Sequence, residues 1–230
     1  MLSIVIPILD EAVHLKQALQ HLTTVCPGAE LIVVDGGSRD GGAEIAERHP
    51  GVRLLRSERG RALQMNAGAE GARGEMLLFL HADTRLPHGA VRAIEAALGD
   101  PAAVGGRFDV RVETRRSLLR LVTTCMNLRS RLTGIATGDQ AIFVRRATFV
   151  SLGGYPGIPL MEDVEFSRRL KRAGRLACLR IQVTTSARKW EREGVLRTIL
   201  LMWSIRFLYW VGVSPARLHQ WYYPDISRQP

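Results

Sequence analysis

Short runs of consecutive apolar residues alternate with amphipathic segments along the first half of the chain. The runs are rich in β-branched residues, which predicts strands buried on both faces; they cover residues 2–6, 30–34, 52–56 and 76–80. The segments between them have helical spacing, at 11–22, up to Arg48 and at 60–71, and Asp40 is a candidate cap for the second of these helices. Because strands and helices alternate, we expect an α/β fold with a mostly parallel sheet flanked by helices.

The alternation weakens after Pro87. Helices are predicted from there to Leu98 and at 115–132 and 162–173, and strands at 104–112, 140–144 and 176–183. The helix at 115–132 is basic, and its apolar residues form an expected packing stripe of Leu118, Leu119, Leu121, Val122, Met126 and Leu128. We find no internal repeat or linker, and expect one domain over 1–190 with an amphipathic, aromatic helical extension over 191–230.

The extension mixes tryptophan, tyrosine and phenylalanine with arginine between Val195 and Tyr223. Arg197 and Arg206 interrupt its most apolar part, which argues against a helix that spans a membrane. Three roles stay open for it: packing on the domain or on a second copy in a homodimer, contact with a membrane surface, and nucleic-acid binding. We favour packing first and membrane contact second, and expect no nucleic-acid partner.

Charge and cysteine content indicate which partners and which cellular compartment to expect. The 230 residues carry a formal net charge of +10, almost all of it from arginine, which suggests an anionic partner such as a nucleotide diphosphate or a lipid headgroup. Cys26, Cys125 and Cys178 are too widely spaced for a C-x-x-C pair, so we expect neither a disulfide framework nor a zinc site. The N-terminus resembles a core strand more than a signal peptide, and a cytoplasmic location is expected, with the inner face of the membrane as a candidate contact.

Acidic side chains follow three of the expected strands: Asp10 and Glu11 after the first, Asp35 at the end of the second and Asp83, with His81, after the fourth. The carboxyl ends of parallel strands form the edge at which open α/β folds bind ligands. A single carboxylate there suits a divalent cation whose other ligands are water and diphosphate oxygens, although Asp83 alone is as easily explained as a cap of the turn before Pro87. Motifs of dinucleotide-binding folds and of P-loops are absent.

Five motifs together resemble the family-2 glycosyltransferases of the GT-A fold, over about residues 2–190. They are Ile-Pro-x-x-Asp-Glu from Ile6, Val-Val-Asp-Gly-Gly-Ser-x-Asp from Val33, Gly-Arg-Ala-x-Gln-Met-Asn-x-Gly from Gly60, His-Ala-Asp from His81 and Met-Glu-Asp from Met161. Within that family the chain is most similar to a small bacterial subgroup labelled arsenosugar biosynthesis or radical-SAM-associated glycosyltransferase.

The resemblance implies a donor site for a nucleotide sugar. Pro7 and Glu11 line its nucleoside pocket, Asp35 binds the base or ribose, and Arg61 lies near the nucleotide. Asp83 matches the last aspartate of the family's D-x-D motif and binds the metal, Mg²⁺ or Mn²⁺. His81 replaces the first aspartate of that motif, and Gly36 stands where many relatives have a second aspartate.

The resemblance also implies an acceptor site around Asp163, which matches the family's catalytic base. Without the other motifs, stabilisation of a helix N-terminus is the favoured role of Asp163. Asp139 and Glu162 are further candidates for acceptor contact. The segment Ser186-Ala-Arg188-Lys-Trp190 resembles the Q-x-x-R-W motif of processive synthases but lacks its glutamine, which suggests transfer of one sugar. Arg188 is a candidate diphosphate contact, and Trp190 either stacks on a sugar or packs in the core.

These features predict a metal-dependent, inverting glycosyltransferase that moves one sugar from a nucleotide diphosphate, with UDP favoured, to a hydroxyl of a small-molecule or lipid-linked acceptor. One alternative is a sugar-phosphate nucleotidyltransferase, which should carry a glycine-rich basic loop where this chain has Ile8-Leu-Asp-Glu11. The other is a protein that binds nucleotides or membrane surfaces without catalysis, in which Asp83 and Asp163 would be replaceable.

Overall fold

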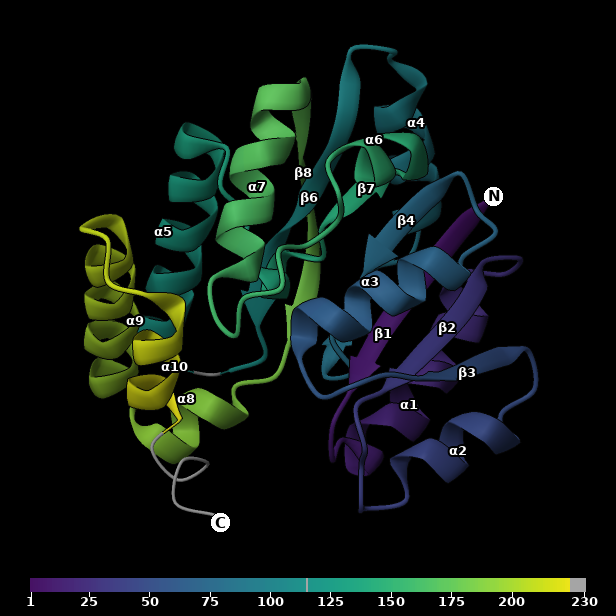
Figure 1. Cartoon of the computed structure of the whole chain (residues 1–230), viewed down its shortest axis with the longest axis horizontal. Coiled ribbons are helices and arrows are strands. Elements are labelled where there is room, and N and C mark those ends of the chain that lie inside the picture. The colour runs from purple at the N-terminus through teal and green to yellow at the C-terminus, as the bar shows by residue number, and fades with distance from the viewer. Residues whose placement is uncertain (115, 224–230) are drawn as a thin grey trace.

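A computed structural model describes residues 1–114 and 116–223. Its centre is one eight-stranded sheet with the order β3-β2-β1-β4-β7-β6-β8-β5 (Figure 1). The strands in chain order are β1 (Leu2–Ile8), β2 (Glu30–Asp35), β3 (Val52–Arg56), β4 (Met76–Phe79), β5 (Thr84–Arg85), β6 (Ala103–Val112), β7 (Phe143–Arg145) and β8 (Arg175–Thr185).

Helices cover both faces of the sheet. Those of the first part are α1 (Ala12–Val25), α2 (Gly42–Arg48), α3 (Arg61–Gly71) and α4 (Ala90–Gly99). They are followed by α5 (Ser117–Thr133), a 3₁₀ turn η1 (Gly138–Gln140), α6 (Arg146–Ser151), α7 (Glu162–Ala173), α8 (Arg188–Glu193), α9 (Val195–Trp210) and α10 (Pro215–Tyr222). The α/β fold with a mostly parallel sheet is confirmed.

The buried strands place apolar side chains on both faces. Ile4 and Ile6 pack with Leu15 and Leu19 of α1, whereas Val5, between them, packs with Met65 of α3 on the other face. Successive residues of a strand point to opposite faces, so a continuous apolar run supplies two cores. This explains why the runs at β1, β2 and β4 lack a polar alternation.

The parallel part of the sheet ends at β4. Strands β3, β2, β1 and β4 pair in parallel, β7 is antiparallel to both β4 and β6, and β6 and β8 are again parallel. The short strand β5 runs antiparallel to β8 and is too short to give a sequence signal. The reversal at β7 places the segment before it, which contains η1, beside the carboxyl end of β4.

Two sequence expectations need correction. The strand expected at 140–144 begins only at Phe143, because Gln140 belongs to η1 and Ala141 adopts a left-handed φ of 47°, which interrupts an extended chain. In the helix expected at 115–132, Leu119 is buried, but Leu118, Leu121 and Leu128 are exposed, so only part of the apolar stripe packs inward. Residue 115, at the expected start of that helix, and residues 224–230 of the expected extension lie outside the described residues.

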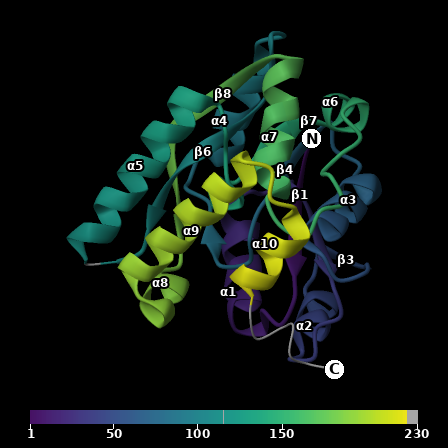
Figure 2. The same cartoon turned by 60° about the vertical axis from the view of Figure 1, so that its left-hand side comes forward.

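Helices α8, α9 and α10 cover the described part of the expected extension and pack on the rest of the chain, although α8 already begins at Arg188, before the expected boundary. Val195, Ile199 and Met202 lie against Leu119 and Val122 of α5. Figures 1 and 2 show α5 and α9 side by side, with α10 returning toward the carboxyl ends of the central strands. The inner face of α9 is therefore part of the folded core, as the packing expectation requires. Within the described part of the chain, the helices are too short or too polar to cross a bilayer.

Candidate functional site

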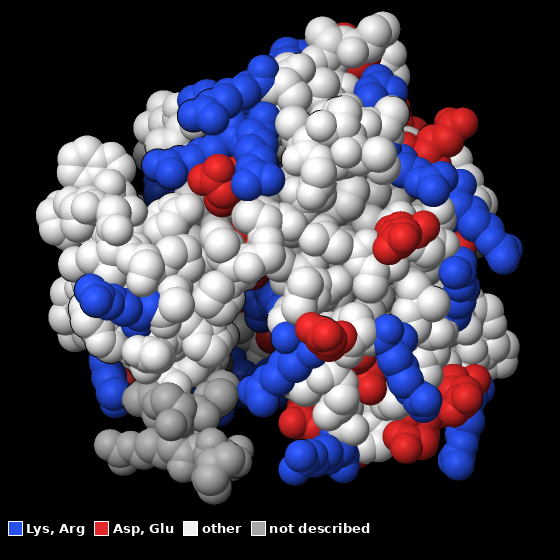
Figure 3. All heavy atoms as spheres, viewed as in Figure 1, with Lys and Arg blue, Asp and Glu red and all other residues white. Residues whose placement is uncertain are grey.

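Three loops meet at one edge of the sheet, as the acidic strand ends predict. The register pairs Ile8 of β1 with Asp35 of β2, and Val5 with Phe79 of β4, so β1, β2 and β4 end close together. Asp10 lies two residues after the end of β1, Gly36 directly follows β2, and His81 lies two residues after the end of β4. Seen in space-filling form, this side of the molecule is hollowed between α9–α10 and the half formed by β1–β3, and both acidic and basic atoms are visible in the hollow (Figure 3).

Hydrogen bonds hold the first two loops in place. The buried Asp35 accepts a hydrogen bond from the Ser38 backbone N–H at 2.9 Å, and Asp10 accepts one from the Arg39 N–H at 2.8 Å. Asp40 accepts from the Gly42 N–H at the start of α2 and also from the Ala12 N–H at the start of α1. The N-cap of α2 is Gly41 rather than Asp40, so the expected capping role of Asp40 is wrong. The proposed nucleoside contacts Pro7, Glu11 and Asp35 therefore lie on a preorganised surface.

Arg188 reaches this surface from the far end of the chain. Its Nη2 donates to Glu11 Oε1 at 3.1 Å, and its Nη1 lies 2.9 Å from His14 Nε2. The ion pair is half exposed, so it contributes little stability by itself. The ion pair matters for the position of Arg188, because it brings the guanidinium group to the loop that follows β1.

The segment after β4 contains His81 and Asp83. His81 Nδ1 lies 3.3 Å from Asp139 Oδ1, while its Nε2 is shielded from solvent without a hydrogen-bond partner. Gly138 lies so close to the ring that an added Cβ would come within 2.6 Å of His81 Cε1. Asp83 is partly buried; its carboxylate accepts only a long hydrogen bond from Thr84 Oγ1, at 3.4 Å, and forms no ion pair within the described residues.

The acidic residues near Asp83 allow a test of whether a cation would fit this segment. Residues 1–114 and 116–223 contain no cluster of three or more His, Cys, Asp or Glu side chains able to hold a metal. The uncommitted carboxylate of Asp83 suits Mg²⁺ or Mn²⁺ whose remaining ligands are diphosphate oxygens and water.

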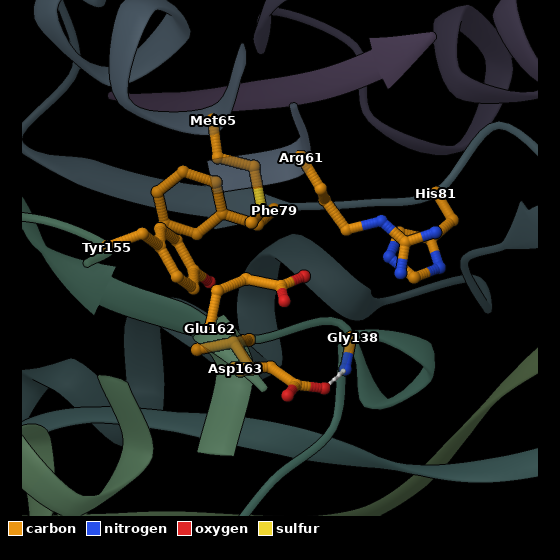
Figure 4. Close-up of a pocket in the computed structure, with 9 residues that line it drawn as sticks. Arg61, Met65, Phe79, His81, Gly138, Tyr155, Glu162 and Asp163 are labelled. Carbon is orange, nitrogen blue, oxygen red and sulfur yellow. Dashed lines mark hydrogen bonds between the residues drawn. The ribbon is translucent and has the colours of Figure 1, made fainter. Parts of the chain in front are cut away.

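A small cavity opens beside this segment and joins it to α7. Figure 4 shows Glu162 and Asp163 projecting into it from the start of α7, opposite Arg61 and His81. The residues that line it are Arg61, Met65, Phe79, His81, Gly138, Ile142, Tyr155, Glu162 and Asp163. The structure therefore brings together four residues predicted for the site from three distant motifs.

Hydrogen bonds orient the carboxylate of Asp163. Its Oδ2 accepts from the Gly138 N–H at 2.9 Å, and its Oδ1 accepts from the Val164 N–H at 2.7 Å. The second bond is of the kind that a helix N-terminus offers, so the helix-terminus role is present. The first joins Asp163 to the turn that contains Asp139, so both candidate bases face one site.

Glu162 is the most perturbed carboxyl group of the cavity. It is only 6% exposed, and burial together with the charge of Asp163 raises the pKa of Glu162 to about 7, although Arg61 opposes this. Arg61 is exposed as a whole, but its guanidinium end lines the cavity (Figure 4). Burial acts to lower the pKa of Arg61, but the electrostatic influence of Glu162, then of Tyr223, Asp139 and Asp163, outweighs it, and the net shift is upward.

Two features of the site were not foreseen. Tyr155 is buried against Phe79 and Phe166, and burial, with the charges of Asp163 and Glu162, raises its pKa, so its hydroxyl stays protonated. Arg129 of α5 and Arg206 of α9 lie on the inner sides of their helices and both feel the charge of Asp163. The sequence signal for Arg206 was that it interrupts the most apolar part of the expected extension, as Arg197 also does. An arginine in a helix as basic as α5 gives no such signal.

Trp190 lies away from the cavity. It is 8% exposed and belongs to an apolar cluster with Val112, Leu119, Ala187 and Val195. Of the two roles left open for it, packing in the core matches this position, and it anchors α8 and α9 to β6 and α5.

Comparisons with known proteins agree on the family. A family model described as "Glycosyl transferase family 2" matches residues 3–149, which ends before Asp163. An undecaprenyl-phosphate 4-deoxy-4-formamido-L-arabinose transferase of Aeromonas hydrophila is 27% identical over 159 residues, 63% of this chain and 48% of that protein. The uncharacterized protein MT1568 of Mycobacterium tuberculosis is 29% identical over 197 residues, 74% of this chain and 61% of that protein. The chain spans about half the length of most curated relatives reported for it.

Solved structures share the fold. TarS residues 1–349 of S. aureus superposes with a TM-score of 0.68 at 18% identity, covering 81% of this chain and 60% of that one. The mannosyltransferase PcManGT from Pyrobaculum calidifontis, in complex with GDP-Man and Mn²⁺, gives 0.63 at 22% identity, covering 80% and 56%. With the matched family model covering more than half of its residues, this chain belongs to glycosyl transferase family 2.

Proposed function

We propose that the protein is a metal-dependent, inverting glycosyltransferase that moves one sugar from a nucleotide diphosphate to an acceptor hydroxyl. The observation that carries the proposal is the shared site of the oriented Asp163 carboxylate and the His81–Asp83 segment, which the contacts of Gly138 and Asp139 join. Transfer needs a base near the acceptor and a charge-neutralising group near the leaving diphosphate, and these two elements supply both.

In this mechanism Asp163 accepts the proton of the acceptor hydroxyl as that oxygen attacks the anomeric carbon. The Gly138 N–H holds Oδ2 of Asp163 in place. Because Glu162 takes up a proton near pH 7, the neighbouring Asp163 carboxylate then experiences less repulsion from a second negative charge. Arg61 balances the remaining negative charge of the cavity. A cation held by Asp83 would offset charge on the departing diphosphate.

UDP is the donor nucleotide we favour. In support, TarS is described in complexes with UDP and with UDP-GlcNAc, whereas PcManGT is described with GDP-Man, so the fold accommodates both. Asp35 and Glu11 are the proposed contacts of base and ribose, and Arg188 the proposed contact of the diphosphate. The resemblance to the arsenosugar and radical-SAM subgroup stays a prediction.

For the acceptor we propose a molecule that reaches the site from a membrane surface. The names of several curated relatives include undecaprenyl phosphate, which supports a lipid-linked acceptor. The outer faces of α5 and α9, here called the α5–α9 face, expose the apolar residues Leu118, Leu121, Leu128, Leu132, Leu196, Leu200, Trp203, Phe207 and Trp210. Neither helix contains an aspartate or glutamate, and the side of the molecule formed by α9 is largely white in Figure 3.

An anionic bilayer surface fits this face better than a second copy of the chain. Exposed tryptophan and leucine beside arginine are typical of helices that lie in a membrane interface. Pairing two copies through this face would bring together helices whose exposed charged residues are arginines, Arg120 on α5 and Arg197 on α9. We therefore propose peripheral membrane contact rather than a homodimer.

A thermal-shift screen of UDP, GDP, dTDP and CDP, each with and without Mn²⁺, tests the donor site. We expect one nucleotide to stabilise the protein only with metal, and Asp83→Ala to remove that effect while Asp100→Ala, a change in the exposed Asp100–Arg175 ion pair, keeps it. If no nucleotide shifts the melting temperature, the transferase proposal fails and non-catalytic binding replaces it.

A further inference from the structure

Arg129 and Arg206 are partly buried cations without a carboxylate partner. Neither forms an ion pair within the described residues, and the hydrogen bond recorded for them is a long one, 3.4 Å, from Arg129 Nη1 to the Ile135 carbonyl. Arg129 Nε and Nη2 are shielded from solvent and have no partner at all. Buried charges in proteins are normally paired, since an unpaired one loses its hydration without compensation.

Other arginines of the same helices behave differently. Arg131, also on α5, is paired with Asp109, which also binds Arg107, and Arg197 on α9 is exposed to solvent. Among the five arginines of α5 and α9, only Arg129 and Arg206 are therefore both partly buried and without an ion pair to the described residues. Both arginines therefore favour the binding of an anion between them. Without an anion, their positive charges stay partly desolvated and uncompensated.

The carboxylates that act on Arg129 and Arg206 belong to the proposed acceptor site around Asp163, not to the segment of the proposed metal ligand Asp83. Both guanidinium groups lie within electrostatic range of Asp163, and Arg206 also of Asp139. Burial first, and then the positive charge of Arg206, lower the pKa of Arg129 to about 10, which a bound anion would reverse. Neither arginine is among the groups that line the loops at Asp35 and Glu11.

We propose that Arg129 and Arg206 together bind a phosphate monoester carried by the acceptor, next to Asp163. This rests on the proposed function, because it assigns the substrate class of the same site. Two planar guanidinium forks can donate several charge-assisted hydrogen bonds to the three terminal oxygens of one phosphate. The phosphate replaces the missing carboxylate partners and fixes the acceptor beside its base.

Calorimetric titration of the full chain with glycerol phosphate, with saturating UDP and Mg²⁺ present, tests the pair directly. Arg129→Met and Arg206→Met should each weaken phosphate binding at least about tenfold, whereas Arg197→Met, an exposed arginine of the same helix, should leave it within about twofold. Arg206→Lys should retain part of the affinity because it keeps the charge. Far-UV circular dichroism and the UDP thermal shift verify that each variant is folded.

A second titration separates the two sources of such a phosphate. Decyl phosphate that binds much more tightly than glycerol phosphate, while decanol does not bind, assigns a lipid phosphate; equal affinities assign a soluble phosphorylated acceptor. The proposal is overturned if both methionine variants bind phosphate as wild type does, or if they lose UDP affinity to the same extent, since the pair would then serve the donor. A wild-type protein that binds phosphate through the pair but no nucleotide would instead contradict the proposed transferase activity.

Discussion

The backbone N–H of Gly138 donates a hydrogen bond to Asp163 Oδ2 at 2.9 Å, across 25 positions of sequence. Gly138 also lies against the ring of His81, where no side chain would fit. One glycine thus joins the helix that carries the proposed base to the segment that carries the proposed metal ligand. The backbone of this turn therefore holds the two halves of the proposed chemistry at a fixed spacing.

Replacement of Asp163 by asparagine should abolish sugar transfer and leave donor binding intact. The amide keeps the shape of the carboxylate but cannot take up a proton, so turnover should fall by about 10²–10⁴-fold. Single-turnover kinetics and nucleotide titration measure the two properties separately. Turnover that survives in this variant would shift the role of base to Asp139 or Glu162, which is resolved by the same measurement on Asp139→Asn and Glu162→Gln.

Replacement of Glu162 by glutamine should change how stability depends on pH. The pKa of Glu162 is raised to about 7 in the folded protein, so the folded state holds a proton that the unfolded state has released above about pH 4.5. Ionisation of Glu162 should therefore lower the free energy of unfolding of the wild-type protein by up to about 3 kcal/mol between pH 4.5 and 7. The Glu162→Gln variant should lack this decrease. Urea unfolding at several pH values checks this, with Glu95→Gln on α4 as control; parallel pH profiles for wild type and Glu162→Gln would refute it.

Introduction of a side chain at Gly68 should destabilise the fold. A Cβ on Gly68 of α3 would lie 2.3 Å from Val5 Cγ1 and 2.9 Å from Val34 Cγ2, both in the buried sheet. Gly68→Ala should lower the free energy of unfolding by about 1–3 kcal/mol, despite the better helix propensity of alanine. Gly99→Ala, with no atom within 4 Å of its Cβ, is the matched control, and equal denaturation midpoints for both variants would show that the sheet adjusts freely.

Loss of the exposed tryptophans of α9 should weaken membrane contact. Trp203 and Trp210 are 73% and 72% exposed, and changing both to glutamate should reduce co-sedimentation with phosphatidylglycerol vesicles by about tenfold or more. Val150→Glu, on the exposed side of α6, should have no effect. Added salt should release the wild-type protein, because its arginines contribute screened attraction. Wild-type protein that stays in solution at low salt would exclude the membrane surface as the occupant of the α5–α9 face.

The sequence by itself determined the α/β class, the parallel direction of the first strands and the edge of the sheet at which the acidic loops gather. Apolar runs buried on both faces and acidic residues just after them are local signals, and parallel strands bring them together whatever the rest of the chain does. The helix at Glu162–Ala173 and the strand at Val52–Arg56 begin and end where the pattern predicts, because each is bounded by glycine, a charge cluster or a turn.

Only the tertiary structure decided which side chains share a cavity. The reversal at β7 brings η1 to His81 and Asp163, and the packing of α9 on α5 brings Arg206 toward Arg129, although 77 positions separate them in the sequence. The same packing decided which leucines of α5 are core and which are surface. Helical periodicity indicates that a face is apolar, but whether a neighbour covers that face depends on contacts between distant segments. The pKa of a buried carboxyl group such as Glu162 depends on such contacts as well.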